Sequence, residues 1–177
     1  VAILPFYDIF KTYIMKYYLL ILCMLPFKIF AQNLNYNDLT NILSETIVQS
    51  SDYLENKGYR IFNTNSNTND NKISYIWDKH GKSNPSVSYL LITWNKSKNY
   101  KMVWYQFHTL SHFNFLKNHL EKSGFKLTDS YVELESLYYQ YTSSRYSVTI
   151  SKGEKNYTFS IRYNWDKVLN NEIIPKY

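Results

Sequence analysis

The pattern of apolar and polar positions predicts a helix followed by four strands. Apolar residues recur at helical spacing in residues 38–57, at Leu39, Ile42, Leu43, Ile47 and Leu54. Four segments with the period-two alternation of half-buried strands follow, at 59–63, 73–78, 87–94 and 100–108. Short polar connections join them, and such connections favour antiparallel pairing.

The second half of the chain has the same predicted order. Ser111 is expected to cap a second helix, whose apolar stripe ends at Gly124 and consists of Phe113, Leu116 and Leu120. Strands are expected at 125–128, 131–141, 146–151 and 157–165, and a tail at 166–177. The order predicts an α+β fold with antiparallel pairing and with the helices packed on one face of the sheet or sheets.

Two matched motifs indicate that the second half is a tandem duplicate of the first. Leu54-Glu-Asn-Lys-Gly-Tyr-Arg-Ile61 recurs as Leu120-Glu-Lys-Ser-Gly-Phe-Lys-Leu127, and Lys98-Asn-Tyr100 recurs as Lys155-Asn-Tyr157. In the longer motif, a glycine that takes positive φ ends a helix, and a strand begins directly after it. We therefore expect a first repeat at residues 32–110 and a second at 111–177, in one sheet or in two.

The predicted element order resembles that of the β-lactamase-inhibitory-protein fold, which is also a tandem of helices on four-stranded sheets. The resemblance lies in the order of the elements. It implies a role in engaging another protein, as an inhibitor or as an assembly factor.

The N-terminal region has the pattern of a secretory signal peptide. Met15-Lys16 is followed by the apolar run 17–27 and by Ala31, after which we expect cleavage. Residues 15–31 are then the signal peptide and residues 1–14 an upstream segment. The alternative is a membrane anchor, but a spanning helix needs about 20 apolar residues. We therefore expect export to the periplasm or the extracellular space of a bacterium, without stable membrane insertion after cleavage.

The charge distribution and the single cysteine argue against a nucleic-acid-binding protein and against a disulfide-stabilised one. The chain carries a net charge of +6 at pH 7, but its lysines are scattered, which is typical of a solvated surface and not of nucleic-acid binding. Its one cysteine, Cys23, lies within the expected signal peptide, so no disulfide is expected in the exported chain.

Aligning the two Lys-Asn-Tyr motifs assigns the two faces of each hairpin. One face is apolar in both repeats and is expected under the helices, with Tyr89, Leu91, Tyr100, Met102 and Trp104 matched to Tyr146, Val148, Tyr157, Phe159 and Ile161. The opposite face of the second repeat is polar, with Ser147, Thr149, Ser151, Ser160, Arg162 and Asn164. The opposite face of the first repeat is apolar, with Leu90, Ile92, Trp94, Val103, Tyr105 and Phe107.

This last set needs a cover, since each large apolar side chain left in water forgoes about 1.5–3 kcal/mol. Burial within the chain is one alternative. The other two alternatives are a homodimer and a different protein partner. In either case, the six residues form the predicted partner-binding site, with Trp94 and Tyr105 as anchors. The sequence thus predicts a non-catalytic protein-binding module.

Candidate chemistry is sparse. His108, His112 and His119 have spacings that metal sites use, but the chain lacks an H-E-x-x-H motif, and we expect no metal and no cofactor. No nucleophile elbow or glycine-rich phosphate loop is present, so no enzyme is expected. The enzymatic alternative is a small envelope enzyme using His108 or His112 with a nearby carboxylate.

A cluster of tyrosines in the second repeat provides a glycan-binding alternative. Tyr138, Tyr139, Tyr141 and Tyr146 lie in one predicted hairpin, and aromatic rings with a polar tip suit binding surfaces. This alternative requires Tyr139 and Tyr141 to be exposed and coplanar.

Overall fold

A computed structural model describes residues 33–67, 72–80, 86–95 and 100–164. The described residues from Leu34 onward belong to one compact unit. The expected upstream segment, the expected signal peptide and the predicted tail at 166–177 lie outside the described residues.

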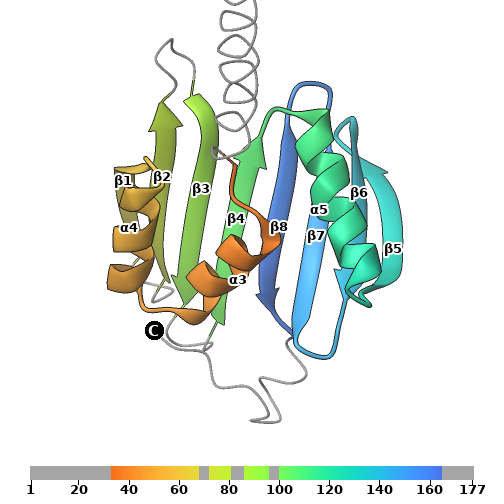
Figure 1. The fold of residues 1–177 in the computed structure, drawn as a ribbon, viewed down its shortest axis with the longest axis horizontal. Coiled ribbons are helices and arrows are strands. Elements are labelled where there is room, and N and C mark those ends of the chain that lie inside the picture. Colours follow the sequence, from red (N-terminus) through yellow and green to blue (C-terminus); the bar gives the residue numbers. More distant parts are fainter. Residues whose placement is uncertain (1–32, 68–71, 81–85, 96–99, 165–177) are drawn as a thin grey trace, which may run out of the picture. The chain divides into compact units, whose positions relative to one another are not determined.

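The described residues form three helices and eight strands (Figure 1). The helices are α3 (Tyr36–Ser44), α4 (Ile47–Asn56) and α5 (Leu110–Lys122). The strands are β1 (Arg60–Asn67), β2 (Lys72–His80), β3 (Ser86–Asn95), β4 (Tyr100–Phe107), β5 (Lys126–Glu133), β6 (Ser136–Thr142), β7 (Tyr146–Lys152) and β8 (Tyr157–Tyr163).

All eight strands belong to one antiparallel sheet with the order β1-β2-β3-β4-β8-β7-β6-β5. Strands β1–β4 form one half of this sheet and β5–β8 the other. The last strands of the two halves, β4 and β8, pair at the centre. The fold is therefore α+β with a single continuous sheet.

The single helix expected at 38–57 is wrong, because the chain breaks into α3 and α4 at Glu45. Thr46 caps α4 with a capping box, in which the Thr46 hydroxyl accepts from the Gln49 N–H and the Gln49 side chain accepts from the Thr46 N–H. The Tyr53 hydroxyl donates a hydrogen bond to the carboxylate of Asp38, which joins the two helices. Capping therefore divides a segment whose apolar spacing is continuous.

The glycines of the repeated motif end α4 and α5 as predicted. Gly58 has φ +83° and Gly124 has φ +78°, values that cost glycine little. After each glycine the next residue bonds back into the helix, from Tyr59 N–H to Leu54 O at 2.9 Å and from Phe125 N–H to Leu120 O at 3.1 Å. Both ends have the six-to-one bond of the Schellman motif, which turns the chain directly into a strand.

The expected strands at 125–128 and 131–141 are also wrong in their boundaries. The chain continues as β5 to Glu133 and turns through Leu134 and Glu135, which have φ of 45° and 61°. Tight hairpin turns of this kind normally use Asn-Gly, whereas Asp129-Ser130 has the composition of a turn but lies within the strand. A side chain in the left-handed region costs about 1–2 kcal/mol, so this turn is strained.

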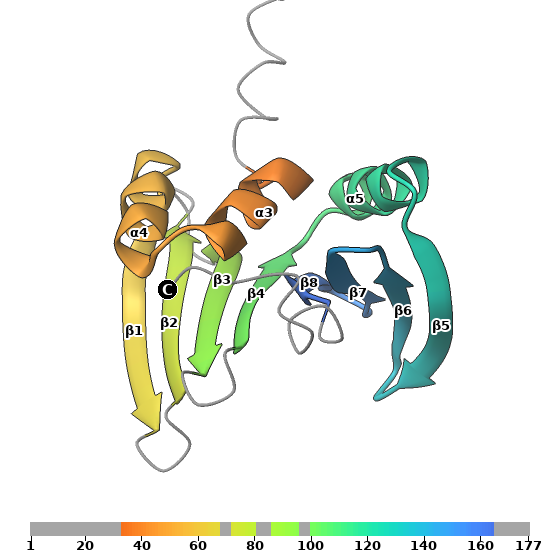
Figure 2. The ribbon, with the colours of Figure 1, turned by 90° about the horizontal axis from the view of Figure 1, so that it is seen from below.

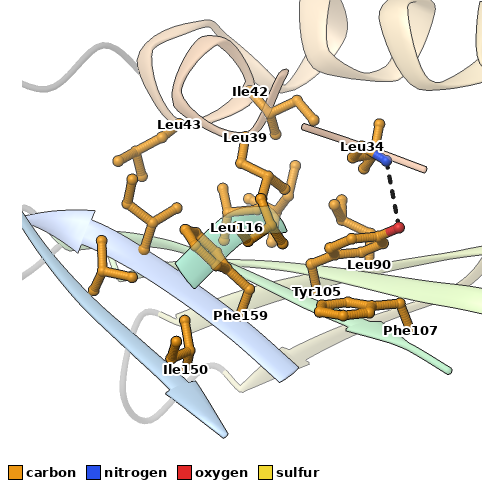
Figure 3. Packing of buried hydrophobic residues seen from close by; sticks show 14 of the residues in the cluster. Leu34, Leu39, Ile42, Leu43, Leu90, Tyr105, Phe107, Leu116, Ile150 and Phe159 are labelled. Atoms are coloured by element: carbon orange, nitrogen blue, oxygen red, sulfur yellow. Dashed lines mark hydrogen bonds between the residues drawn. The ribbon is translucent and has the colours of Figure 1, made fainter. Parts of the chain in front are cut away.

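The hydrophobic core lies between the helices and the sheet. Figure 2 shows α3, α4 and α5 on the same side of the sheet, which we call the helix-facing side. Figure 3 shows Leu39, Ile42 and Leu43 of α3 directed toward side chains of the sheet, with Leu116 of α5 in the same cluster. The strand residues labelled in this view are Leu90, Tyr105, Phe107, Ile150 and Phe159. The other side, which no helix of the described residues covers, we call the helix-free side.

The expected orientation of the first repeat is wrong. Tyr89, Leu91, Tyr100, Met102 and Trp104 were assigned to the helices, but all five are only half-buried. Val103 is the cross-strand partner of Ile161, so these two side chains point to the same side of the sheet. The Lys-Asn-Tyr alignment had instead placed Trp104 on the same side as Ile161. A slip of one residue moves every side chain to the other face. In the second half of the chain Val148, Phe159 and Ile161 are buried, as expected.

A buried lysine completes the helix-facing side of β4. The Lys101 ammonium group donates to the carbonyl oxygen of Ile42 at 2.8 Å and to that of Glu45, at the C-terminal end of α3. Terminal carbonyls of a helix lack intrahelical donors and carry partial negative charge, so a cation stabilises them. Burial lowers the pKa of Lys101 to about 8.

We predict that Lys101→Met lowers the free energy of unfolding at pH 7 by about 1–3 kcal/mol, because the buried carbonyl of Ile42 and the partly buried carbonyl of Glu45 lose a charged donor. Urea denaturation measures this difference. Lys152→Met, at an exposed lysine, is the matched control and should change stability little. Equal stability of the wild type and Lys101→Met would contradict the prediction.

We also predict that Glu135→Gly stabilises the protein by about 1 kcal/mol, since glycine adopts positive φ without a steric penalty. A rise in the midpoint of thermal unfolding would report it. Glu154→Gly makes the same chemical change at a turn residue without positive φ, and it should not stabilise. If both variants shift the midpoint equally, strain at Glu135 is not the cause.

Candidate functional site

Five of the six predicted partner-binding residues are covered by the chain itself. Leu90, Ile92, Val103, Tyr105 and Phe107 are at most 1% exposed and belong to the core cluster. The sixth, Trp94, is half-buried on the same side and pairs with Lys101 in the register of β3 and β4. Side chains buried in this way offer no surface to a partner of the folded chain, which fits the alternative of burial within the chain.

The polar groups of this core hold the start of the folded unit. Tyr105 accepts a hydrogen bond at its hydroxyl from the Leu34 N–H at 3.3 Å (Figure 3). The His112 Nε2 atom lies 3.0 Å from the Leu34 carbonyl oxygen, so the neutral ring donates from Nε2. Leu34 itself is buried. Both backbone groups of Leu34 are therefore satisfied by side chains from β4 and α5.

Burial sets the protonation state of these groups. It raises the pKa of the Tyr59 and Tyr105 hydroxyls, and the Tyr59 hydroxyl lies 2.7 Å from that of Ser88. It also lowers the pKa of His112, although the hydrogen bond to Leu34 acts in the opposite direction. Removing a charged form from water carries a large penalty, so all three groups are neutral at pH 7.

The histidines considered for catalysis contact backbone carbonyls. His108 is exposed, with its Nδ1 atom 3.4 Å from the carbonyl oxygen of Lys155. His112 is occupied by Leu34, and the ring of His119 lies against that of Tyr36 with centroids 4.6 Å apart. Among the described residues, no group of three or more His, Cys, Asp and Glu is placed to hold a metal ion.

The tyrosine cluster divides between the two sides of the sheet. Tyr141 is only 1% exposed and donates to the Glu121 carboxylate at 3.2 Å, and burial raises its pKa to about 12. Tyr139 lies under the Lys117 ammonium group of α5 at 4.9 Å. The coplanar pair is instead Tyr131 and Tyr138, whose rings stack at 5.1 Å and 7°. The condition set for glycan binding through Tyr139 and Tyr141 is not met.

The helix-free side carries a second apolar group, spread over three neighbouring strands. Its members are Ile76, Tyr89, Leu91, Tyr100, Met102 and Trp104, all half-buried. The register aligns Ile76 with Leu91 and Leu91 with Trp104, so these three form one continuous row across β2, β3 and β4. We call the six residues the apolar patch. No predicted site residue belongs to it, because the sequence analysis had placed all of its members except Ile76 under the helices.

The other half of the helix-free side is polar. The row of Trp104 continues through Ser160 on β8 to Thr149 on β7, and that of Met102 reaches the exposed Arg162. On this side, β8 and β7 carry polar residues, whereas β3 and β4 carry the patch residues interspersed with Thr93, Asn95 and Gln106. This arrangement places hydroxyl groups and the guanidinium group of Arg162 beside the apolar patch.

Comparisons with family models, with curated proteins and with solved structures found no match to this chain. The likeness to the β-lactamase-inhibitory-protein fold therefore rests on element order alone. None of the helices in the described part of the chain is long and apolar enough to cross a bilayer.

We predict that His112 makes the protein sensitive to acid. Its pKa is lower in the folded chain than the ordinary value of 6.5, so its contribution to stability is present above pH 6.5 and is lost as the pH falls through the folded pKa. His112→Gln keeps a side-chain N–H donor without a titrating group, and its stability should fall less between pH 7.5 and 5. Urea denaturation across this range measures the difference.

The exposed His108 provides the control for this experiment, because His108→Gln removes the same group from the surface. That variant should follow the pH profile of the wild type. If His112→Gln instead runs parallel to the wild type over the whole range, His112 does not carry the acid sensitivity.

Proposed function

We propose that this chain is an exported, non-catalytic protein-binding module that engages a partner through the apolar patch on the helix-free side of β2, β3 and β4. The observation that carries this proposal is the position of six large apolar side chains on neighbouring strands, where no helix of the described residues covers them. Contiguous apolar surface of this kind marks interaction sites on soluble proteins.

The composition of the patch supports binding to a protein surface. Tryptophan, tyrosine and methionine are enriched at the centres of protein interfaces, where water is excluded. Trp104 lies between Leu91 on β3 and Ser160 on β8, at the border of the patch, and tryptophan is among the residue types most enriched in interface anchors. Met102 lies on the same strand, and its sulfur accepts a hydrogen bond from Tyr100 at 3.2 Å.

The margin of the patch indicates the chemistry of the partner. Arg162 is exposed beside Met102 in the register of β4 and β8, and a guanidinium group suits a carboxylate. Ser160 and Thr149 add hydroxyl groups in the adjacent row. The proposed partner therefore presents apolar side chains with an acidic residue at their edge.

Tandem duplication and export are part of the same proposal. The matched motifs occupy equivalent places in the two halves: Leu54 and Leu120 are buried, Gly58 and Gly124 take positive φ, and an edge strand follows each glycine. The mirror-like strand order, with β4 beside β8, fits two related units joined at their last strands. Export rests on the signal-peptide pattern at residues 15–31.

We predict that Trp104→Lys abolishes partner capture while the protein stays folded, because this side chain lies on the open side of the sheet. Affinity capture from a cell-envelope extract, followed by mass spectrometry, compares the variant with the wild type. The loss expected for an interface anchor is about 2 kcal/mol or more, roughly thirtyfold in affinity. Circular dichroism confirms that the variant is folded.

Tyr138→Lys is the matched control, since Tyr138 lies on the same side of the sheet but in the polar half. It should retain the captured partner. Capture of the same proteins by the wild type, Trp104→Lys and Tyr138→Lys would contradict the proposed role of the patch.

A further inference from the structure

Strand β5 is an open edge of the sheet, and it is unusually exposed. Every residue of Lys126–Glu133 is exposed except Tyr131, which is half-buried. Two of the exposed side chains are apolar, Leu127 at 54% and Val132 at 73%. In the described chain only β6 pairs with this strand. Such an edge is a template for another strand, because its outward N–H and C=O groups are available for pairing.

A β-bulge gives β5 its particular pattern of side chains. Leu127 pairs with Tyr141 and Asp129 with Gln140, so Thr128 is left outside the ladder. The bulge changes the alternation, and Leu127 and Val132 both point to the helix-facing side although they are five residues apart. Lys126 and Glu133 both point to the helix-free side, opposite Thr142 and Ser136 of β6.

Seven residues of β5 remain in the ladder with β6. Their sequence is complementary to itself when read in the reverse direction, with Ser130 at the centre. Read against itself in the antiparallel direction, the strand places Lys126 opposite Glu133, Leu127 opposite Val132, Asp129 opposite Tyr131 and Ser130 opposite Ser130. Each pair consists of residues on the same side of the sheet. We propose that β5 pairs with β5 of a second copy of this chain, antiparallel, around a two-fold axis at Ser130.

The contacts of this register favour a second copy as the occupant. The pairing of Lys126 with Glu133 occurs twice, as symmetry requires, and each is a cross-strand pair of opposite charges. Leu127 and Val132 also pair twice, which removes apolar surface from water on the helix-facing side. Each of these four residues therefore has a partner of complementary chemistry in the second copy.

The geometry of the sheet permits this symmetry without rearrangement. A two-fold axis perpendicular to the sheet keeps neighbouring strands antiparallel and keeps the helices of both copies on one side. It repeats the relation between β4 and β8 within a single chain. The dimer would extend the eight-stranded sheet across its edge.

The other edge of the sheet lacks this complementarity. In β1, the same reversal places Arg60 opposite Asn67 and the exposed Ile61 opposite Ser66, because the exposed Phe62 lies outside the ladder. It offers no opposite charge to Arg60. The proposed dimer uses the β5 edge and leaves the apolar patch open, so it goes beyond the proposed function and each of the two can fail alone.

Charge reversal tests the proposed register. The mass of the protein, produced from its full sequence, is measured by light scattering across a concentration series. Glu133→Lys places two lysines opposite each other at both symmetric positions, as does Lys126→Glu with two carboxylates, and each variant should weaken the dimer at least tenfold, an order of magnitude expected from two reversed pairs. Combining Lys126→Glu with Glu133→Lys restores opposite charges and should restore dimerisation.

The control for net charge is Glu154→Lys, at an exposed residue of the β7–β8 turn, and this variant should dimerise as the wild type does. A wild type that is monomeric throughout the series overturns the proposal. So does a dimer that neither single reversal weakens, because pairing then uses β1, the apolar patch or another surface.

A crosslink tests the position of the two-fold axis. In a Cys23→Ser background, Ser130→Cys places two thiols opposite each other, within the range that a disulfide spans after small adjustment. Mild oxidation should give a covalent dimer. Ser144→Cys, at an exposed turn, should remain a monomer on a denaturing gel. Equal crosslinking of both variants, or crosslinking of Ser144→Cys alone, overturns the assigned register.

Discussion

The pairing of β4 with β8 is the constraint on which the rest of the structure depends. It joins the two halves into one sheet and aligns Val103 with Ile161 and Tyr105 with Phe159. Those four side chains are fully buried on the helix-facing side, so the register of this single pair decides which side of both halves the core occupies. A shift by one residue would expose them and would bury Trp104 and Met102 in their place.

Side chains on the helix-facing side then fix the position of Leu34, at the start of the folded unit. Tyr105 comes from β4 and His112 from α5, and both bond to Leu34. Lys101 extends the same row of β4 to the end of α3. The central strand thus fixes α3 at both of its ends, because the chain enters the helix next to Leu34 and leaves it at Glu45. Polar groups inside this core position the first helix, and apolar burial supplies most of the stability.

Much of this architecture follows from local sequence. The glycine stops at Gly58 and Gly124 were predicted because only glycine takes positive φ at low cost, and the apolar stripe of α5 lies where its spacing placed it. The side that each strand in the first half of the chain presents to the helices was not predicted, since it depends on the pairing of distant strands. The turn at Leu134 and Glu135 was missed because it lacks the usual turn residues. Because the sides of β3 and β4 were exchanged, five of the six patch residues, all except Ile76, were assigned to the core, and five core residues were assigned to the partner-binding site.

As in the sequence comparison, the two halves are alike under the helices and different on the other side of the sheet, although the residues of the first half that lie on each side are exchanged. On the helix-facing side β4 and β8 are alike, with Val103, Tyr105 and Phe107 beside Ile161, Phe159 and Tyr157, because both must pack under helices. On the helix-free side they differ, with Met102 and Trp104 facing Arg162 and Ser160. The need for a hydrophobic core explains why the helix-facing residues of β4 and β8 are alike, but it does not explain why their helix-free residues differ. A half-exposed tryptophan and methionine contribute less to folding than buried ones would, and their presence on the open side supports the proposal that this side contacts a partner.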